Sequence, residues 1–227
     1  MGTSKGYIAP TTVHWSQAKR AVTSYINNGD GDSRTNAASK YTQAMRHDIA
    51  TSSAFSHSAG NILSFASAVS HGGINNALRE FGRNDLIGKS SDEIFNELIQ
   101  GFTNYGSTTE DYLSSEAISH ALINLEIKDM EQLKDVSPDV LLKEMLIEYI
   151  ILSFAFRYEE KISMKKTPAE TSKLIDEMGK YISNTLHDKL NLSDVKTVDF
   201  NKMQSSEVVT NALVDAYQVF EMFYGEA

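Results

Sequence analysis

The stretch Ser137–Ile162 reads SPDVLLKEMLIEYIILSFAFRYEEKI, and its pattern decides the fold class. Ser137 can N-cap a helix, and Pro138 fits the first helical position, where its missing N–H costs nothing. A helix that is apolar nearly all round is covered by other elements of the fold. We therefore predict a buried central helix at about 138–161. Its apolar side chains recur at Val140, Leu141, Met145, Leu146, Tyr149, Ile150, Leu152, Phe154 and Phe156.

This helix is not predicted to cross a membrane. Charged residues such as Lys143, Glu148 and Arg157 interrupt it. Its uncharged part runs only from Tyr149 to Phe156, well short of the roughly 18–20 apolar residues that a bilayer requires. We therefore expect no membrane partner.

The rest of the chain also favours helices. The 227 residues include only three prolines, so long stretches lack the usual helix breaker. Ser90-x-x-Glu93 and Thr167-Pro168-Ala169-Glu170 are strong helix-start signals. Turn-rich residues 27–32 and the pair Gly72-Gly73 separate helical segments. The alternating VKTVDF within 191–204 could form a short strand, but we expect an irregular connector there.

We predict an all-α fold with a single multi-helix domain over residues 13–227, built around the central helix. Residues 1–12, MGTSKGYIAPTT, show neither a helical nor a strand period. They contain two glycines, small polar side chains and a proline, which favours extended backbone before it. We therefore predict that they form an extended, flexible N-terminal arm.

Composition narrows the classes of function. The chain has no cysteine, which excludes disulfides, thiolate metal sites and a cysteine nucleophile, and which fits the reducing cytoplasm. Its first residues lack the apolar core of a signal peptide, so we expect a cytoplasmic protein. The net charge is −9, and residues 114–227 carry −8 of it. This acidity argues against direct nucleic-acid binding and leaves room for a basic protein partner, although solubility alone could explain it.

No motif for catalysis stands out. The six histidines form no H-x-x-x-H pair and no H-E-x-x-H motif, and no G-x-S-x-G is present. Gly88-Lys89-Ser90 is similar to the end of a phosphate-binding loop, but five residues separate Gly82 from Gly88 where the motif has four, and no apolar strand precedes them. Ser90 is better explained as a helix cap. We therefore expect no enzyme activity, no metal and no cofactor.

The start Met1-Gly2 has a chemical consequence. Glycine is small, so removal of Met1 would leave a free glycine amine. An α-amine has a pKa of about 8, so part of it is neutral and nucleophilic at pH 7. Myristoylation is not indicated, because position 6 is Gly6 where that motif has Ser or Thr. Many proteins begin with Met-Gly without using it, so the residue pattern alone leaves this role open.

Several stretches resemble a known family. They are the arm with Trp15 and KRAVTSY, LIGKSSDEIFNEL at 86–98, SPDVLLKEM at the start of the central helix, and the ending DAYQVFEMFYGEA. Together they are similar to the QatB family, the small components of bacterial Qat anti-phage defence systems. The resemblance covers most of the chain, although none of these stretches is a catalytic motif.

This resemblance implies a partner and an acceptor. Qat operons encode an ATPase, a QueC-like enzyme called QatC and a TatD-like nuclease. The resemblance implies that the QueC-like partner binds this chain and conjugates a 7-deazaguanine to Gly2, with the operon ATPase as a further candidate partner. Thr3, Ser4, Gly6 and Tyr7 would be the recognition context. Because Met1 stands in this sequence, the acceptor amine would require its removal.

Three hypotheses result from the sequence. In the first, a non-catalytic all-α protein offers its arm to a modifying enzyme. In the second, the helical body is an adaptor or scaffold that holds defence subunits together and is not modified. In the third, an enzyme site is assembled from scattered residues, which the missing motifs disfavour.

Overall fold

Two helices begin at the capping boxes that the sequence predicts. The computed structural model of the chain describes residues 12–200 and 204–224. Ser90 Oγ accepts a hydrogen bond from the Glu93 N–H at 3.3 Å, and the Glu93 carboxylate accepts one from the Ser90 N–H at 3.2 Å. Thr167 and Glu170 make the same reciprocal pair at 3.3 and 2.9 Å. Each box satisfies two backbone donors that a helix start leaves unpaired.

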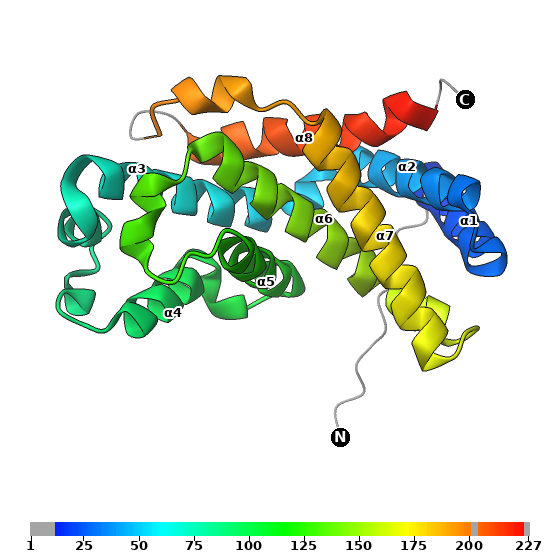
Figure 1. Cartoon of the computed structure of the whole chain (residues 1–227), viewed down its shortest axis with the longest axis horizontal. Helices are drawn as coiled ribbons and strands as arrows, with labels where there is room; N and C mark the ends of the chain where they lie inside the picture. Colours follow the sequence, from blue (N-terminus) through cyan, green and yellow to red (C-terminus); the bar gives the residue numbers. More distant parts are fainter. Residues whose placement is uncertain (1–11, 201–203, 225–227) are drawn as a thin grey trace. The chain divides into compact units, whose positions relative to one another are not determined.

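Within the described ranges, every regular element is a helix, which confirms the all-α fold (Figure 1). The expected connector at 191–204 contains only a single 3₁₀ turn, Ser193–Thr197, in its described part. The α-helices are α1 Val13–Asn28, α2 Gly31–His47, α3 Ser53–Glu80, α4 Ser91–Phe102, α5 Thr109–Asn124, α6 Pro138–Ser163, α7 Pro168–Lys189 and α8 Ser205–Tyr224. Short 3₁₀ turns lie at η1 Ile49–Ser52, η2 Asn84–Leu86, η3 Asn104–Gly106 and η4 Met130–Asp135.

The first helix pair has a shorter connection than the sequence predicts. Gly29 takes a left-handed φ of 67° and its N–H bonds to the Tyr25 carbonyl at 2.9 Å, which ends α1. Asp30 then caps α2 by accepting from the Ser33 N–H at 2.7 Å. The predicted linker at 27–32 was therefore too long, because only Gly29 and Asp30 lie between the two helices.

The predicted break at Gly72-Gly73 is confirmed as a kink within α3. Gly73 has φ 74° and ψ 169°, outside the helical region and readily adopted by glycine. The N–H of the next residue, Ile74, donates to Glu131 Oε2 at 2.9 Å. A side chain from η4 therefore satisfies a donor that the kink removes from the helix.

The central helix is confirmed as α6, but its burial is less complete than predicted. Val140 and Phe156 were expected in the core, yet each is 42% exposed. Conversely, Ser153 and Arg157 are buried. The cause is helical geometry, because residues four apart lie on one face and residue 157 follows residue 153 on the face that meets α1. The buried apolar residues of α6 are Leu141, Leu142, Met145, Leu146, Ile147, Tyr149, Ile150, Phe154, Tyr158 and Ile162.

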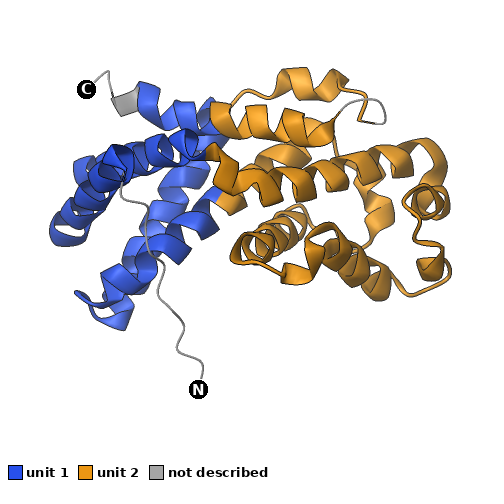
Figure 2. Ribbon diagram, turned by 180° about the vertical axis from the view of Figure 1, so that it is seen from behind, with its two compact units in different colours: residues 1–48, 150–189, 216–227 blue, residues 49–149, 190–215 orange. Residues whose placement is uncertain are grey.

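The described residues divide into two compact units, shown in Figure 2. Unit 1 comprises residues 1–48, 150–189 and 216–227, and unit 2 comprises 49–149 and 190–215. Both α6 and α8 therefore contribute one part to each unit. The sequence-based expectation of a single domain over 13–227 stays a prediction.

The core of unit 1 is aromatic. Tyr41 of α2 meets Phe154 and Tyr158 of α6 edge to face, with ring centroids 5.3 and 5.9 Å apart. Trp15 of α1 approaches Tyr41 in the same way at 6.4 Å. Such pairs add about 0.5–1.5 kcal/mol each beyond the area that they bury.

Unit 2 is built on α3. Phe55 of α3 stacks on Tyr149 of α6 with centroids 4.1 Å apart. Gly60 of α3 approaches the backbone of α8 so closely that a Cβ would lie 2.8 Å from the Ser206 nitrogen. The absence of a side chain at Gly60 therefore permits the close contact between α3 and α8.

The buried face of α6 yields the first prediction. Ile150→Asp should destabilise the protein by more than about 4 kcal/mol or prevent folding, because Ile150 is fully buried and an unpaired carboxylate there loses its hydration. Chemical denaturation followed by circular dichroism measures this. The matched control is Val140→Asp on the exposed face of the same helix, which should cost less than about 1 kcal/mol. Equal melting temperatures for the wild type and Ile150→Asp would show that α6 is not central.

Candidate functional site

The residues that the sequence proposes as the site lie outside the described part of the chain. Gly2, Thr3, Ser4, Gly6 and Tyr7 all precede residue 12, where the structure begins. The structure therefore gives no geometry for the acceptor or its recognition context. What it does describe is the point at which the arm joins the helical body, which we call the arm root: Thr12, His14, Trp15, His47 and Asp48.

The arm root is fixed by a helix cap and a buried tryptophan. Thr12 Oγ1 accepts from the Trp15 N–H at 3.4 Å and so caps α1. The Trp15 ring is buried, and its Nε1–H donates to Asp48 Oδ2 at 3.2 Å. Asp48 follows the last residue of α2. One side chain therefore ties the start of α1 to the end of α2.

Two histidines stack beside this tie. The rings of His14 in α1 and His47 in α2 lie parallel, with centroids 3.7 Å apart and an interplanar angle of 8°. His14 lies in the first turn of its helix and His47 in the last turn of its own. The stack lies directly beside the Trp15–Asp48 pair at the arm root.

Two cations of α6 hold α1 from its other side. The Arg157 guanidinium lies over the Trp15 ring, 5.5 Å from its centroid. Lys161 Nζ donates to the Lys19 carbonyl at 2.9 Å and to Thr23 Oγ1 at 2.6 Å. Burial, and next the charge of Lys19, lowers the pKa of Lys161 to about 8. This amine is therefore partly neutral at pH 7, but its protons are directed to oxygens of α1.

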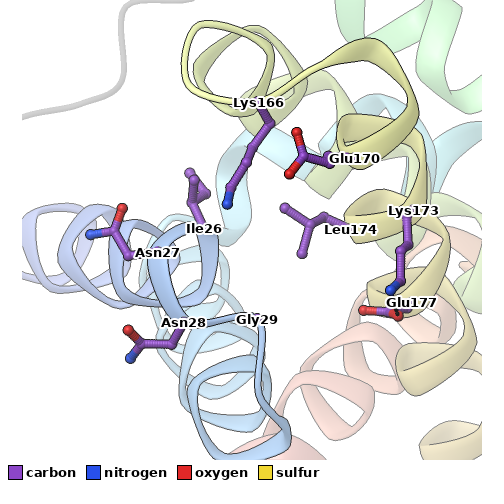
Figure 3. A pocket seen from close by; sticks show the side chains of 9 residues that line it. All are labelled: Ile26, Asn27, Asn28, Gly29, Lys166, Glu170, Lys173, Leu174 and Glu177. Carbon is purple, nitrogen blue, oxygen red and sulfur yellow. Dashed lines mark ion pairs between the residues drawn. The ribbon is translucent and has the colours of Figure 1, made fainter.

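A small cavity opens between the end of α1 and the start of α7 (Figure 3). Its volume is about 150 Å³, below the roughly 300–1,000 Å³ of ligand pockets. Lys166 and Leu174 point into it, and Lys173 pairs with Glu177 at 3.8 Å. The lining charges therefore balance within the protein. The cavity is lined by Ile26, Asn27, Asn28, Gly29, Lys166, Glu170, Lys173, Leu174 and Glu177.

A buried hydroxyl near this cavity is structural. Tyr25 OH donates to the Leu174 carbonyl at 2.9 Å. Burial, and then the charge of Glu177, raises the pKa of Tyr25 to about 12. A phenol held neutral in this way does not act as a base near pH 7. The contact joins α1 to α7 and does not form an acid–base pair.

The segment similar to a phosphate-binding loop has the wrong environment for phosphate. Residues before Gly82 belong to helix α3, and no strand precedes it among the described residues. Lys89 lies 3.4 Å from Glu93, and the Ser90 N–H donates to Glu93. The adjoining hollow is lined by the acids Asp85, Glu93 and Glu97 with Lys89 as its only cation. Ser90 is thus a helix cap, as the sequence indicates.

Residues 12–200 and 204–224 contain no cluster of three or more His, Asp or Glu side chains arranged to hold a metal ion. No helix in these ranges is both long and apolar enough to span a membrane.

Sequence reasoning missed the arm root. Its pairs join residues 33 positions apart, His14 with His47 and Trp15 with Asp48. No motif spacing marks such pairs, since they depend on how α1 and α2 pack against each other.

Comparison with known families identifies the family of this chain. The model of a family described as Qat anti-phage system associated protein QatB matches residues 40–220. The chain belongs to the QatB family. No curated protein and no solved structure matches it.

Membership makes the chain a component of a Qat anti-phage defence system. The matched region begins within α2, so it includes α3 to α7 and most of α8 but not the arm or α1. The assignment to the QatB family therefore rests on the helical body. The match does not include the arm, so it does not test the role of the arm.

The tie between Trp15 and Asp48 yields a second prediction. Trp15→Phe keeps an aromatic ring against Tyr41 but removes the Nε1–H donor, so we expect a loss of about 1–3 kcal/mol in unfolding free energy. Asp48→Asn weakens the same bond. Urea unfolding of both single variants and the double variant measures the coupling. Costs that simply add would contradict a direct bond between the two side chains.

The environment of Lys89 yields a third. Titration calorimetry of the isolated protein with ATP should show no saturable binding, because the hollow is acidic and the loop lacks a preceding strand. Lys89→Ala should behave as the wild type does. Saturable binding that disappears in Lys89→Ala would restore the phosphate-loop hypothesis.

Proposed function

We propose that this QatB-family protein is a non-catalytic defence component that binds the QueC-like enzyme QatC. It presents the amine of Gly2, after removal of Met1, for conjugation to a 7-deazaguanine. The observation that carries the proposal is membership of the QatB family, together with a Met1-Gly2 start on an arm without apolar periodicity.

The chemistry needs an activated acid and a free amine. A QueC-type enzyme transfers AMP from ATP to a 7-deazaguanine carboxylate and releases pyrophosphate. The neutral Gly2 amine then attacks the acyl carbon, AMP leaves, and the nitrogen loses a proton as the amide forms. Glycine suits this step because it has no side chain to obstruct the attack. Thr3, Ser4, Gly6 and Tyr7 follow as the recognition context.

The arm root would give the arm a fixed starting point on the helical body. A segment that enters an active site needs a fixed origin, since its reach is set by the residues beyond the last anchored one. Thr12 and Trp15 provide that origin in α1. Nine residues lie between Gly2 and Thr12, so ten residue steps connect them, and each extended step spans at most about 3.6 Å. The arm can therefore reach roughly 35 Å from the root.

Few other amines of the chain would compete with the Gly2 amine as the nucleophile. A lysine such as Lys5 has a pKa of about 10.4 and is largely protonated at neutral pH. Lys161 is the exception, with its pKa lowered to about 8 by burial. Its hydrogen bonds to Lys19 and Thr23 hold that amine against α1. The N-terminal amine is thus the better nucleophile of the three.

Several histidines and carboxylates of the described residues take part in a helix cap, an ion pair and a ring stack. The adaptor hypothesis, in which the body holds defence subunits such as the operon ATPase without being modified, is the alternative if no adduct forms.

The acceptor assignment yields a fourth prediction. When the protein is expressed with its operon, Gly2→Glu should abolish both methionine removal and conjugation, because Glu at position 2 blocks processing and removes the acceptor. Lys5→Arg and Lys161→Arg should retain the adduct, since each removes a competing primary amine and keeps a positive charge. Fragmentation mass spectrometry of the N-terminal peptide locates the modification.

Two outcomes would contradict the proposal. An adduct that survives in Gly2→Glu but disappears in Lys161→Arg would assign the reaction to the body of the protein. An unmodified N-terminal peptide in Lys5→Arg alone would assign it to that lysine.

A further inference from the structure

Helix α5 buries one apolar face and also carries two large apolar residues on its outer, otherwise polar side. Its inner face is packed, with Leu113, Ala117, Ile118, Ala121 and Leu122 buried. On its outer side, Tyr112 is 55% exposed and Ile123 is 65% exposed. Most surface helices keep polar residues on the solvent side. Single exposed apolar residues are common on protein surfaces, so the distinguishing features here are the alignment of these two and the charge between them.

The two exposed residues lie on one line along the helix. At about 100° per residue, positions 112 and 123 differ by roughly 20° around the axis and by about 16 Å along it. Glu116 and Ser119 fall on the same line between them. We call Tyr112, Glu116, Ser119 and Ile123 the α5 stripe. It has an apolar residue at each end, an acid and a small hydroxyl in the middle.

The segment of sequence that contains the stripe is acidic. Residues 90–127 contain seven Asp or Glu and no Lys or Arg. Arg83 and Lys89, which precede this segment, are already paired with Glu97 and Glu93. His120 and Asn124 on α5 are bonded to the Glu148 carboxylate.

Glu116, at the centre of the stripe, is different from these acids. Among the described residues, no cation lies within ion-pair distance of it. The stripe therefore presents an uncompensated negative charge between two apolar anchors.

A strained aromatic residue lies in the 3₁₀ turn that precedes this helix. Tyr105, in η3, has φ 53° and ψ 29°, and the residue is 66% exposed. A left-handed conformation costs a bulky L-residue about 1–2 kcal/mol. Because the side chain is exposed, it gains no apolar burial within the described structure to offset this cost. An exposed aromatic that the fold itself does not need is typical of a contact residue.

We propose that the α5 stripe is a docking surface for a basic amphipathic helix of a partner protein. Tyr112 and Ile123 would pack against apolar residues of that helix, and Glu116 would pair with a Lys or Arg between them. Helix-on-helix recognition uses such anchors at i, i+4, i+7 and i+11. The complement of an acidic, apolar-ended stripe is a helix with a basic residue between apolar ones.

A second copy of this chain fits the stripe less well. A symmetric dimer brings the same patch of both subunits together. Glu116 is central, so two such carboxylates would face each other across the contact, which is unfavourable. The docking surface also includes no residue of the arm, so it is independent of the proposed conjugation at Gly2.

The test uses a labelled peptide of about 18 residues, long enough for partial helicity, with leucine at i, i+4, i+7 and i+11 and lysine elsewhere. Fluorescence anisotropy with the full chain should show saturable binding that weakens as salt is added. Tyr112→Ser, Ile123→Ser and Glu116→Lys should each weaken it by about tenfold or more. A peptide with glutamate in place of lysine should not bind.

Matched controls keep the test specific. Val140→Ser removes an exposed apolar residue elsewhere in unit 2, and Glu80→Lys reverses an exposed acid outside the stripe. Both should bind as the wild type does, and circular dichroism should show every variant folded. Absence of binding, or equal losses in the controls and the stripe variants, would overturn the proposal. So would a concentration-dependent dimer in sedimentation that Ile123→Ser dissociates, because the stripe would then belong to a second copy.

Discussion

The structure depends on the burial of α6. One half of this helix lies in each compact unit, and in each unit a ring of α6 anchors the core. Tyr149 stacks on Phe55 in unit 2, and Phe154 meets Tyr41 in unit 1. Ordering a helix of this length has a large conformational cost, which only extensive apolar burial can offset.

The same helix connects packing to the proposed function. Through Arg157 and Lys161 it holds α1 in place, and α1 carries the arm root. Under the proposal, the arm needs no buried face, since it would extend to the modifying enzyme. A rigid root and an unpatterned arm are complementary, because the root fixes where the acceptor amine starts and the arm provides its reach. The body would thus act as a holder for a substrate segment.

The sequence predicts much of this fold because its signals are local. Apolar period and capping residues located α4, α6 and α7, and glycine located the kink in α3. Side-chain exposure was less predictable, since Val140 and Phe156 are apolar but lie where no described element covers them fully. The arm root was not predictable at all, because Trp15 and Asp48 meet only after α1 and α2 pack. Helical spacing places Tyr112 and Ile123 of the α5 stripe on one line along the helix. The sequence alone does not show that this side of the helix is exposed.

The central claim is that a QatB-family body delivers an N-terminal glycine to a modifying enzyme. Its most direct test is the intact mass of the wild-type protein, purified once from cells expressing it alone and once from cells expressing the whole operon. The account predicts the mass of the chain without Met1 in the first sample and that mass plus a 7-deazaguanine acyl group in the second. Identical masses in the two samples, with no adduct, would contradict it and leave the adaptor role in its place.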